Sequence, residues 1–130
     1  STVLSPMTAY AAEIQPEEKP PLYEEVKDLL DEDEVVTAKD YEIETGSVFD
    51  VKSDYTGLEI KDDNKVKVTF EEAKNDKDED FTTDHADTYK AVYYVEPQTT
   101  SHPMYQISRN ITVKEAATSE VPDQPKTDCA

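Results

Sequence analysis

Three segments in the carboxy-terminal half of the chain alternate apolar and polar residues, and this alternation constrains the fold more than any other feature. The segments are Val66 to Glu71, Tyr89 to Glu96 and Tyr105 to Val113. Successive side chains of a β-strand point to opposite faces, so each segment predicts a strand. The intervening segments are acidic, which is typical of loops. The sequence therefore predicts an all-β domain of antiparallel strands.

The last two predicted strands differ in how their faces are occupied. Segment 89–96 has apolar residues on both faces, which predicts a central strand. Segment 105–113 alternates cleanly, except that Arg109 falls in the inward register. Two explanations stay open at this point: a β-bulge that turns Arg109 outward, or a position at the rim of the sheet.

A helix is predicted ahead of the strands, from Pro21 to Asp31. Its apolar residues recur at the helical spacing i, i+4, i+7 and i+8: Leu22, Val26, Leu29 and Leu30. The acidic residues 31–34 are predicted to end it, because carboxylates are unfavourable at the negative end of the helix dipole. A helix of about three turns is marginal alone, so we expect it to pack on the β-domain.

The sequence between this helix and residue 88 predicts further strands and one long loop. Residues 35–44 predict a strand, residues 45–47 a turn, and Val48 to Val51 a second short strand. Residues 72–88 are strongly acidic and predict a loop, with Phe81 as its anchor.

The sequence divides the chain into four segments. Residues 1–12 contain the small-x-small pattern Ala9-Tyr10-Ala11, so they are interpreted either as a signal-peptide remnant or as a disordered N-terminus. Residues 13–20 predict an acidic, proline-rich linker, residues 21–115 the helix and β-domain, and residues 116–130 a C-terminal linker. A signal peptide would imply export from the cell.

The net charge of the chain limits its partners. It is −18, from 31 acidic and 13 basic residues in 130. This charge argues against nucleic acid and anionic membrane, since phosphate would be repelled, and no segment is long and apolar enough to span a bilayer. It favours a soluble monomer. The single cysteine, Cys129, cannot form a disulfide within the chain, so packing must hold the fold.

Three segments resemble the bacterial immunoglobulin-like modules of Gram-positive surface proteins. In that family, an Ala-x-Asp strand leads to an Ile-x-x-Gly-x-x-Phe-Asp corner, and a Gly-Thr-Tyr turn opens a strand that pairs with a closing Arg-x-Ile-x-Val strand. The matching segments are Val36 to Asp50, Asp87 to Val95 and Tyr105 to Val113. The resemblance implies an immunoglobulin-like antiparallel β-sandwich, here with one short N-terminal α-helix, at the cell surface.

The chain departs from the family pattern at two places. Asp87 stands where the family has glycine, and Tyr55 to Ile60 replaces a small Ala-x-Asp segment, which leaves the order of the middle strands open. The tail contains Gln124-Pro-Lys-Thr-Asp128, which resembles a sortase sorting signal. Pro125 and Thr127 are thus candidate anchoring residues, although Asp128 replaces the required glycine and a truncated linker is the alternative.

No catalytic residues are predicted. His85 and His102 lie in separate predicted loops, and neither has a serine or cysteine placed beside it in a nucleophile pattern. We therefore expect no enzymatic activity and no cofactor. Asp76, Asp78 and Asp80 are candidate calcium ligands, but the spacing of an EF-hand loop is absent.

Two functions stay open. The first is a structural or presenting module of an exported bacterial surface protein. The second is an adhesin domain that binds a host protein, an immunoglobulin or a matrix protein, through an aromatic sheet face or a strand edge. The candidate binding residues are Tyr94, Val92, Lys90 and Tyr41. The two functions differ in whether the helix covers Tyr94 and its neighbours.

Overall fold

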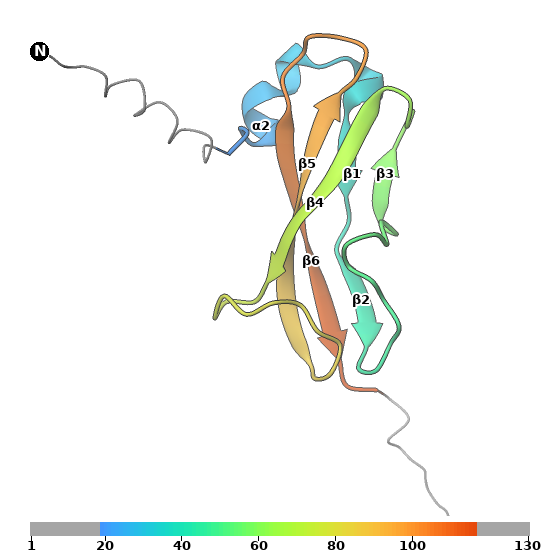
Figure 1. The fold of residues 1–130 in the computed structure, drawn as a ribbon, viewed down its shortest axis with the longest axis vertical. Helices are drawn as coiled ribbons and strands as arrows, with labels where there is room; N and C mark the ends of the chain where they lie inside the picture. The colour runs from blue at the N-terminus through green and yellow to red at the C-terminus, as the bar shows by residue number, and fades with distance from the viewer. Residues whose placement is uncertain (1–18, 117–130) are drawn as a thin grey trace, which may run out of the picture.

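The computed structural model describes residues 19–116, whose strands form two sheets (Figure 1). The larger sheet has the order β2-β6-β5-β4, with bounds Tyr41–Glu44, Tyr105–Lys114, Asp87–Pro97 and Val66–Lys74. The smaller sheet pairs β1 (Val36–Ala38) with β3 (Leu58–Ile60). One short helix, α2 (Tyr23–Val26), precedes the strands. The all-β prediction is confirmed at this level.

Several predictions concern segments outside the described residues. These are the signal-peptide remnant at 1–12, most of the linker at 13–20 and the tail with Pro125 and Thr127.

Strand β5 is the centre of the larger sheet, as the sequence predicted. It pairs antiparallel with β4 on one side and with β6 on the other. Its inward side chains are almost completely buried: Tyr89, Ala91, Tyr93 and Val95. A strand with two neighbours and a covered face needs this apolar composition, because its polar backbone is satisfied by the ladders on both sides.

The sheet is not wholly antiparallel, in contrast to the sequence prediction. Strand β2 runs parallel to β6, with register from Tyr41 beside Ile111 to Glu44 beside Lys114. The chain leaves β1 in the small sheet and enters β2 in the large one through Lys39 and Asp40 alone, so both strands run the same way. This crossover places the start of the β-domain beside its last strand.

The predicted helix over Pro21 to Asp31 is wrong in length. The chain at Leu22 instead forms a parallel bridge to Gln106 of β6, which delays the start of the helix. After four residues, α2 tightens into the 3₁₀ turn η3 (Lys27–Leu29). The side chain of Leu29 is 58% exposed, so the apolar stripe never lies on one buried face. Contacts with β6 override the helical pattern.

The predicted strand from Val48 to Val51 is also wrong. These residues form a loop in which Val48 is fully exposed, while Phe49 and Val51 turn into the core. Phe81 anchors the acidic loop between β4 and β5, as predicted, because its ring lies against those of Phe49 and Tyr89. Loops rather than strands therefore cover the lower half of the larger sheet.

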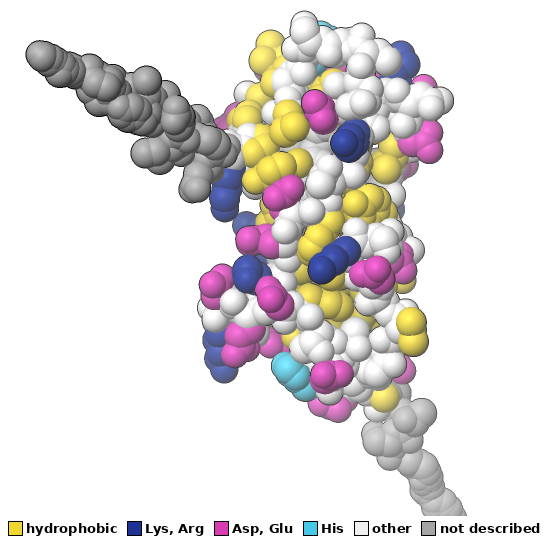
Figure 2. Space-filling view, viewed as in Figure 1, with side chains coloured by type: hydrophobic (Ala, Val, Ile, Leu, Met, Phe, Trp, Pro, Cys, Tyr) yellow, Lys and Arg dark blue, Asp and Glu magenta, His cyan; other side chains and the backbone are white. Residues whose placement is uncertain are grey.

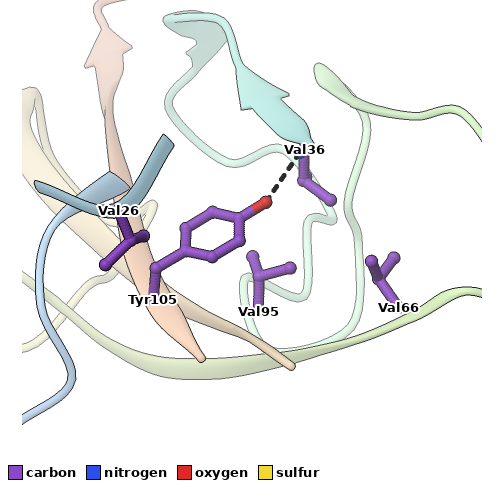
Figure 3. Packing of buried hydrophobic residues seen from close by; sticks show 5 residues of the cluster. All are labelled: Val26, Val36, Val66, Val95 and Tyr105. Carbon is purple, nitrogen blue, oxygen red and sulfur yellow. Dashed lines mark hydrogen bonds between the residues drawn. The ribbon is translucent and has the colours of Figure 1, made fainter. Parts of the chain in front are cut away.

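The core has two parts: an upper part beside α2, at the top of Figure 1, and a lower part at the opposite end of the larger sheet. In the upper part, Val26 of α2, Val36 of β1 and Val66 of β4 pack around Val95 and Tyr105 (Figure 3). The Tyr105 hydroxyl accepts a hydrogen bond from the Val36 N–H at 2.9 Å. This one side chain therefore joins the two sheets.

Arg109 lies in neither of the places that the sequence suggested. The β5–β6 register is regular around it, and its side chain points inward and is 3% exposed. It donates to the Tyr93 hydroxyl at 3.1 Å and to the Thr56 carbonyl. Gly57, whose φ is +100°, gives the guanidinium room, because a Cβ there would collide with it. The lower core is thus built around a buried cation.

Candidate functional site

Tyr94, Val92 and Lys90 lie on the face of β5 that points away from the small sheet, since their strand neighbours are the buried inward residues. Tyr94 and Val92 are half-buried and Lys90 is exposed. Helix α2 does not cover them. It packs on the opposite face, where Tyr23 and Val26 contact Tyr105.

A hollow of about 200 Å³ lies beside Tyr94 on this outer face. Lys19 and Val92 line it together with the carboxylates of Glu71 and Glu72. Burial raises the pKa of the Tyr94 hydroxyl, and the two carboxylates raise it further. The hydroxyl therefore stays protonated at neutral pH and is available as a hydrogen-bond donor.

Tyr41 does not belong to this outer surface. Its ring packs against Phe49, and the Arg109 guanidinium lies 5.5 Å from the ring centroid. Tyr41 and Tyr94 are thus on opposite faces of the larger sheet. The structure brings together three of the four predicted ligand-binding residues and separates the fourth, because β2 turns its odd-numbered side chains inward.

The acidic loop does not gather Asp76, Asp78 and Asp80 into a group of donors. All three side chains are exposed, and Asp80 accepts a hydrogen bond from Lys74 at 2.9 Å, which lowers its pKa. Asn75 organises the loop, since its amide donates to Glu79 and to Asp87, each at 2.8 Å. The acidic side chains around this loop are visible at the lower left of Figure 2.

A different cluster is the closest set of metal-ligating groups within residues 19–116. Asp31, Glu34 and His102 each offer a donor atom, and these atoms lie within 4.8 Å of one another. Glu34 is only 1% exposed. Its carboxylate accepts from the Thr100 hydroxyl at 2.6 Å and lies 2.7 Å from His102 Nδ1.

No sequence motif points to this cluster. Glu34 lies in an acidic run that reads as solvated, in the 3₁₀ turn η4 (Glu32–Glu34), and His102 follows 68 residues later in the β5–β6 loop. The turn is held by the Glu34 carboxylate, which accepts the Asp31 N–H at 2.8 Å. Only the tertiary fold brings the two segments together.

The pKa values of Glu34 and His102 are displaced in opposite directions. Burial raises the pKa of Glu34, but hydrogen bonds from Thr100, the Asp31 N–H and His102 outweigh it, so the pKa lies below the ordinary 4.5. The hydrogen bond with Glu34 raises the pKa of His102 above 6.5, although burial opposes this.

These displacements predict a stability contribution that is largest between pH 4.5 and 6.5. The lowered pKa of Glu34 stabilises the fold above pH 4.5, and this contribution is lost as the pH falls through the folded-state value. The raised pKa of His102 stabilises it below pH 6.5, and this contribution is lost as the pH rises through the folded-state value.

Urea denaturation of chelator-treated protein checks this prediction. The difference in stability between wild type and His102→Gln should shrink between about pH 5.5 and about pH 8.5. His85→Gln is the control, since the His85 ring is exposed and lies 4.0 Å from Asp87 in the other loop. A His102→Gln difference that stays constant over this range would contradict the assignment.

Comparison of the chain with family models, with curated proteins and with solved structures finds no significant match. Among the residues that the structure describes, no helix has the length and hydrophobicity needed to cross a membrane.

Proposed function

We propose that this chain is a non-enzymatic, immunoglobulin-like module of an exported bacterial surface protein, which acts as a load-bearing spacer and presents neighbouring parts of that protein. The observation that carries the proposal is the parallel pairing of β2 with β6. The sequence resemblance and the two-sheet architecture support the immunoglobulin-like assignment. The small sheet has only two strands, fewer than such domains usually have.

The path of the chain suits a spacer. The described chain enters beside α2, towards one end of the long axis, and β6 leaves at the other end (Figure 1). Tension along the chain would therefore act along the strands. The acidic surface adds to this role, because a strong net charge keeps neighbouring modules soluble and apart.

Parallel pairing at the two ends of the domain makes this tension a shearing load. Pulling moves β2 towards its own start and β6 towards its own end, so the hydrogen bonds from Tyr41 to Glu44 are strained together rather than in turn. The bridge between Leu22 and Gln106 is also parallel and is loaded in the same way. Several bonds must then break at once.

Single-molecule pulling tests the proposal. Stretching the domain between its termini should require a several-fold higher unfolding force than pulling from cysteines placed at His85 and Glu115, in a Cys129→Ser background. The second geometry opens the β5–β6 pair from its end, where Asp87 lies beside Val113, and breaks one pair at a time. Equal forces in the two geometries would refute the load-bearing role.

The adhesin function is a second candidate, favoured by the position of α2. Because the helix packs on the inner face, it leaves Tyr94 and Val92 available beside the hollow that Lys19 lines. Tyrosine supplies a large contact area at low entropic cost, which suits a binding face. Salt-resistant capture of one plasma or matrix protein, lost in Tyr94→Ala but kept in Thr88→Ala on the same face, would establish it.

A further inference from the structure

We propose that Asp31, Glu34 and His102 bind a first-row divalent cation, for which Zn²⁺ is the fitting probe, and that the cation fastens the turn η4 to the β5–β6 loop. The donors are one imidazole nitrogen and two carboxylates, all within 4.8 Å of one another. This donor set suits zinc and its neighbours, whereas calcium and magnesium take oxygen ligands.

The donor atoms lie near one another, although not yet at the separations that two ligands of a bound ion would have. His102 Nδ1 and Glu34 Oε1 are 2.7 Å apart. Two ligands on a tetrahedral zinc, each bonded at about 2.0 to 2.1 Å, lie about 3.3 Å apart. The His102–Glu34 pair would have to open by about 0.6 Å, and a pair at the 4.8 Å limit would have to close by about 1.5 Å, to form the site. Three protein donors leave one coordination position for water.

Glu34 is already oriented for this role. Its side chain is 1% exposed, and the Thr100 hydroxyl donates to Oε2 at 2.6 Å, which fixes the plane of the carboxylate. Hydrogen bonds of this kind orient metal ligands in known sites. A buried carboxylate held in this way needs little reorientation to bind an incoming cation.

The two lysines that pair with η4 bind other carboxylates than Glu34, so neither of them neutralises the proposed site. Within η4, Glu32 pairs with Lys61 at 3.1 Å and Asp33 with Lys65 at 3.4 Å. Glu34 forms its ion pair with His102 itself, at 2.7 Å. The His102 side chain is 34% exposed and Asp31 is exposed, so an ion can reach the donors from solvent.

Isothermal titration of the full chain, chelator-treated and carrying Cys129→Ser, tests the proposal with Zn²⁺. Wild type should bind one ion per chain, while Ca²⁺ should show no saturable binding. His102→Gln should weaken Zn²⁺ binding at least about tenfold. Asp31→Asn should weaken it to a smaller degree, and His85→Gln should leave it unchanged. Zn²⁺ should also raise the melting temperature of wild type but not of His102→Gln.

Each outcome decides the proposal, because His102 and Asp31 are accessible and their variants can be checked for folding by circular dichroism. Absence of saturable Zn²⁺ binding by wild type would overturn it. So would equal losses in His102→Gln and His85→Gln, which would assign the binding to diffuse surface groups. An unchanged Zn²⁺ affinity in Asp31→Asn would show that Asp31 is not a ligand, and the proposed three-donor site would then be wrong.

Discussion

Replacing Arg109 with alanine should lower the free energy of unfolding by about 3 to 5 kcal/mol. The side chain is buried, donates to the Tyr93 hydroxyl and the Thr56 carbonyl, and lies 5.6 Å from the Tyr93 ring centroid. Truncation removes the packing of the methylenes, which contributes about 2 kcal/mol. It also leaves the Tyr93 hydroxyl and the Thr56 carbonyl without their donor, which costs about 1 to 3 kcal/mol more. Urea denaturation followed by circular dichroism measures the loss.

Two matched variants separate the causes. Arg109→Met keeps most of the buried stem but has no donors, so it should lose less than Arg109→Ala. Lys114→Ala removes an exposed charge that pairs with Glu42 at 3.1 Å, and it should cost less than about 1 kcal/mol. A loss below about 1 kcal/mol for Arg109→Ala would show that the guanidinium is not a structural element.

Tyr105→Phe should cost about 2 to 3 kcal/mol, although it removes a single oxygen. The hydroxyl accepts from the Val36 N–H at 2.9 Å and donates to the Glu34 carbonyl at 2.7 Å. Both groups are in the buried upper core, so each loses a partner that water cannot replace. Burial, as the largest cause, raises the Tyr105 pKa to about 12, which keeps the hydroxyl protonated as a donor. Thermal and urea unfolding measure the cost.

Tyr89→Phe is the control for this prediction. The Tyr89 side chain is as deeply buried as that of Tyr105, but within residues 19–116 its hydroxyl has no hydrogen bond of regular geometry, only a weaker interaction with the Thr82 backbone. Removing it should change stability by less than about 0.5 kcal/mol or raise it. Equal effects in the two variants would mean that burial, rather than the bonds to Val36 and Glu34, governs the cost.

The strands could be predicted from sequence where the pattern is local. Alternation at every second residue located β4, β5 and β6, and apolar residues on both faces placed β5 at the centre. The helix at Pro21 to Asp31 could not be predicted in the same way. Its spacing was helical, but the bridge from Leu22 to Gln106 and the packing of Val26 on Tyr105 decided the local backbone.

The candidate site was predictable only in part. Tyr94, Val92 and Lys90 share a face because they alternate along one strand, which is a local property. The separation of Tyr41 from them depends on how β2 joins β6, some 70 residues later. The cluster of Glu34 with His102 had no local signal, because a glutamate in an acidic run gives no indication that it is buried.

By itself, the sequence determined that this chain is all-β, where its long strands lie and which strand is central, because side-chain alternation and burial along one strand are properties of neighbouring residues. The tertiary structure decided that Arg109 is buried, that β2 runs parallel to β6, and that Glu34 meets His102. These outcomes depend on contacts between segments far apart in the chain. Such contacts follow from how the two sheets pack. Packing buries certain polar groups, and each of these must then find a hydrogen-bond partner.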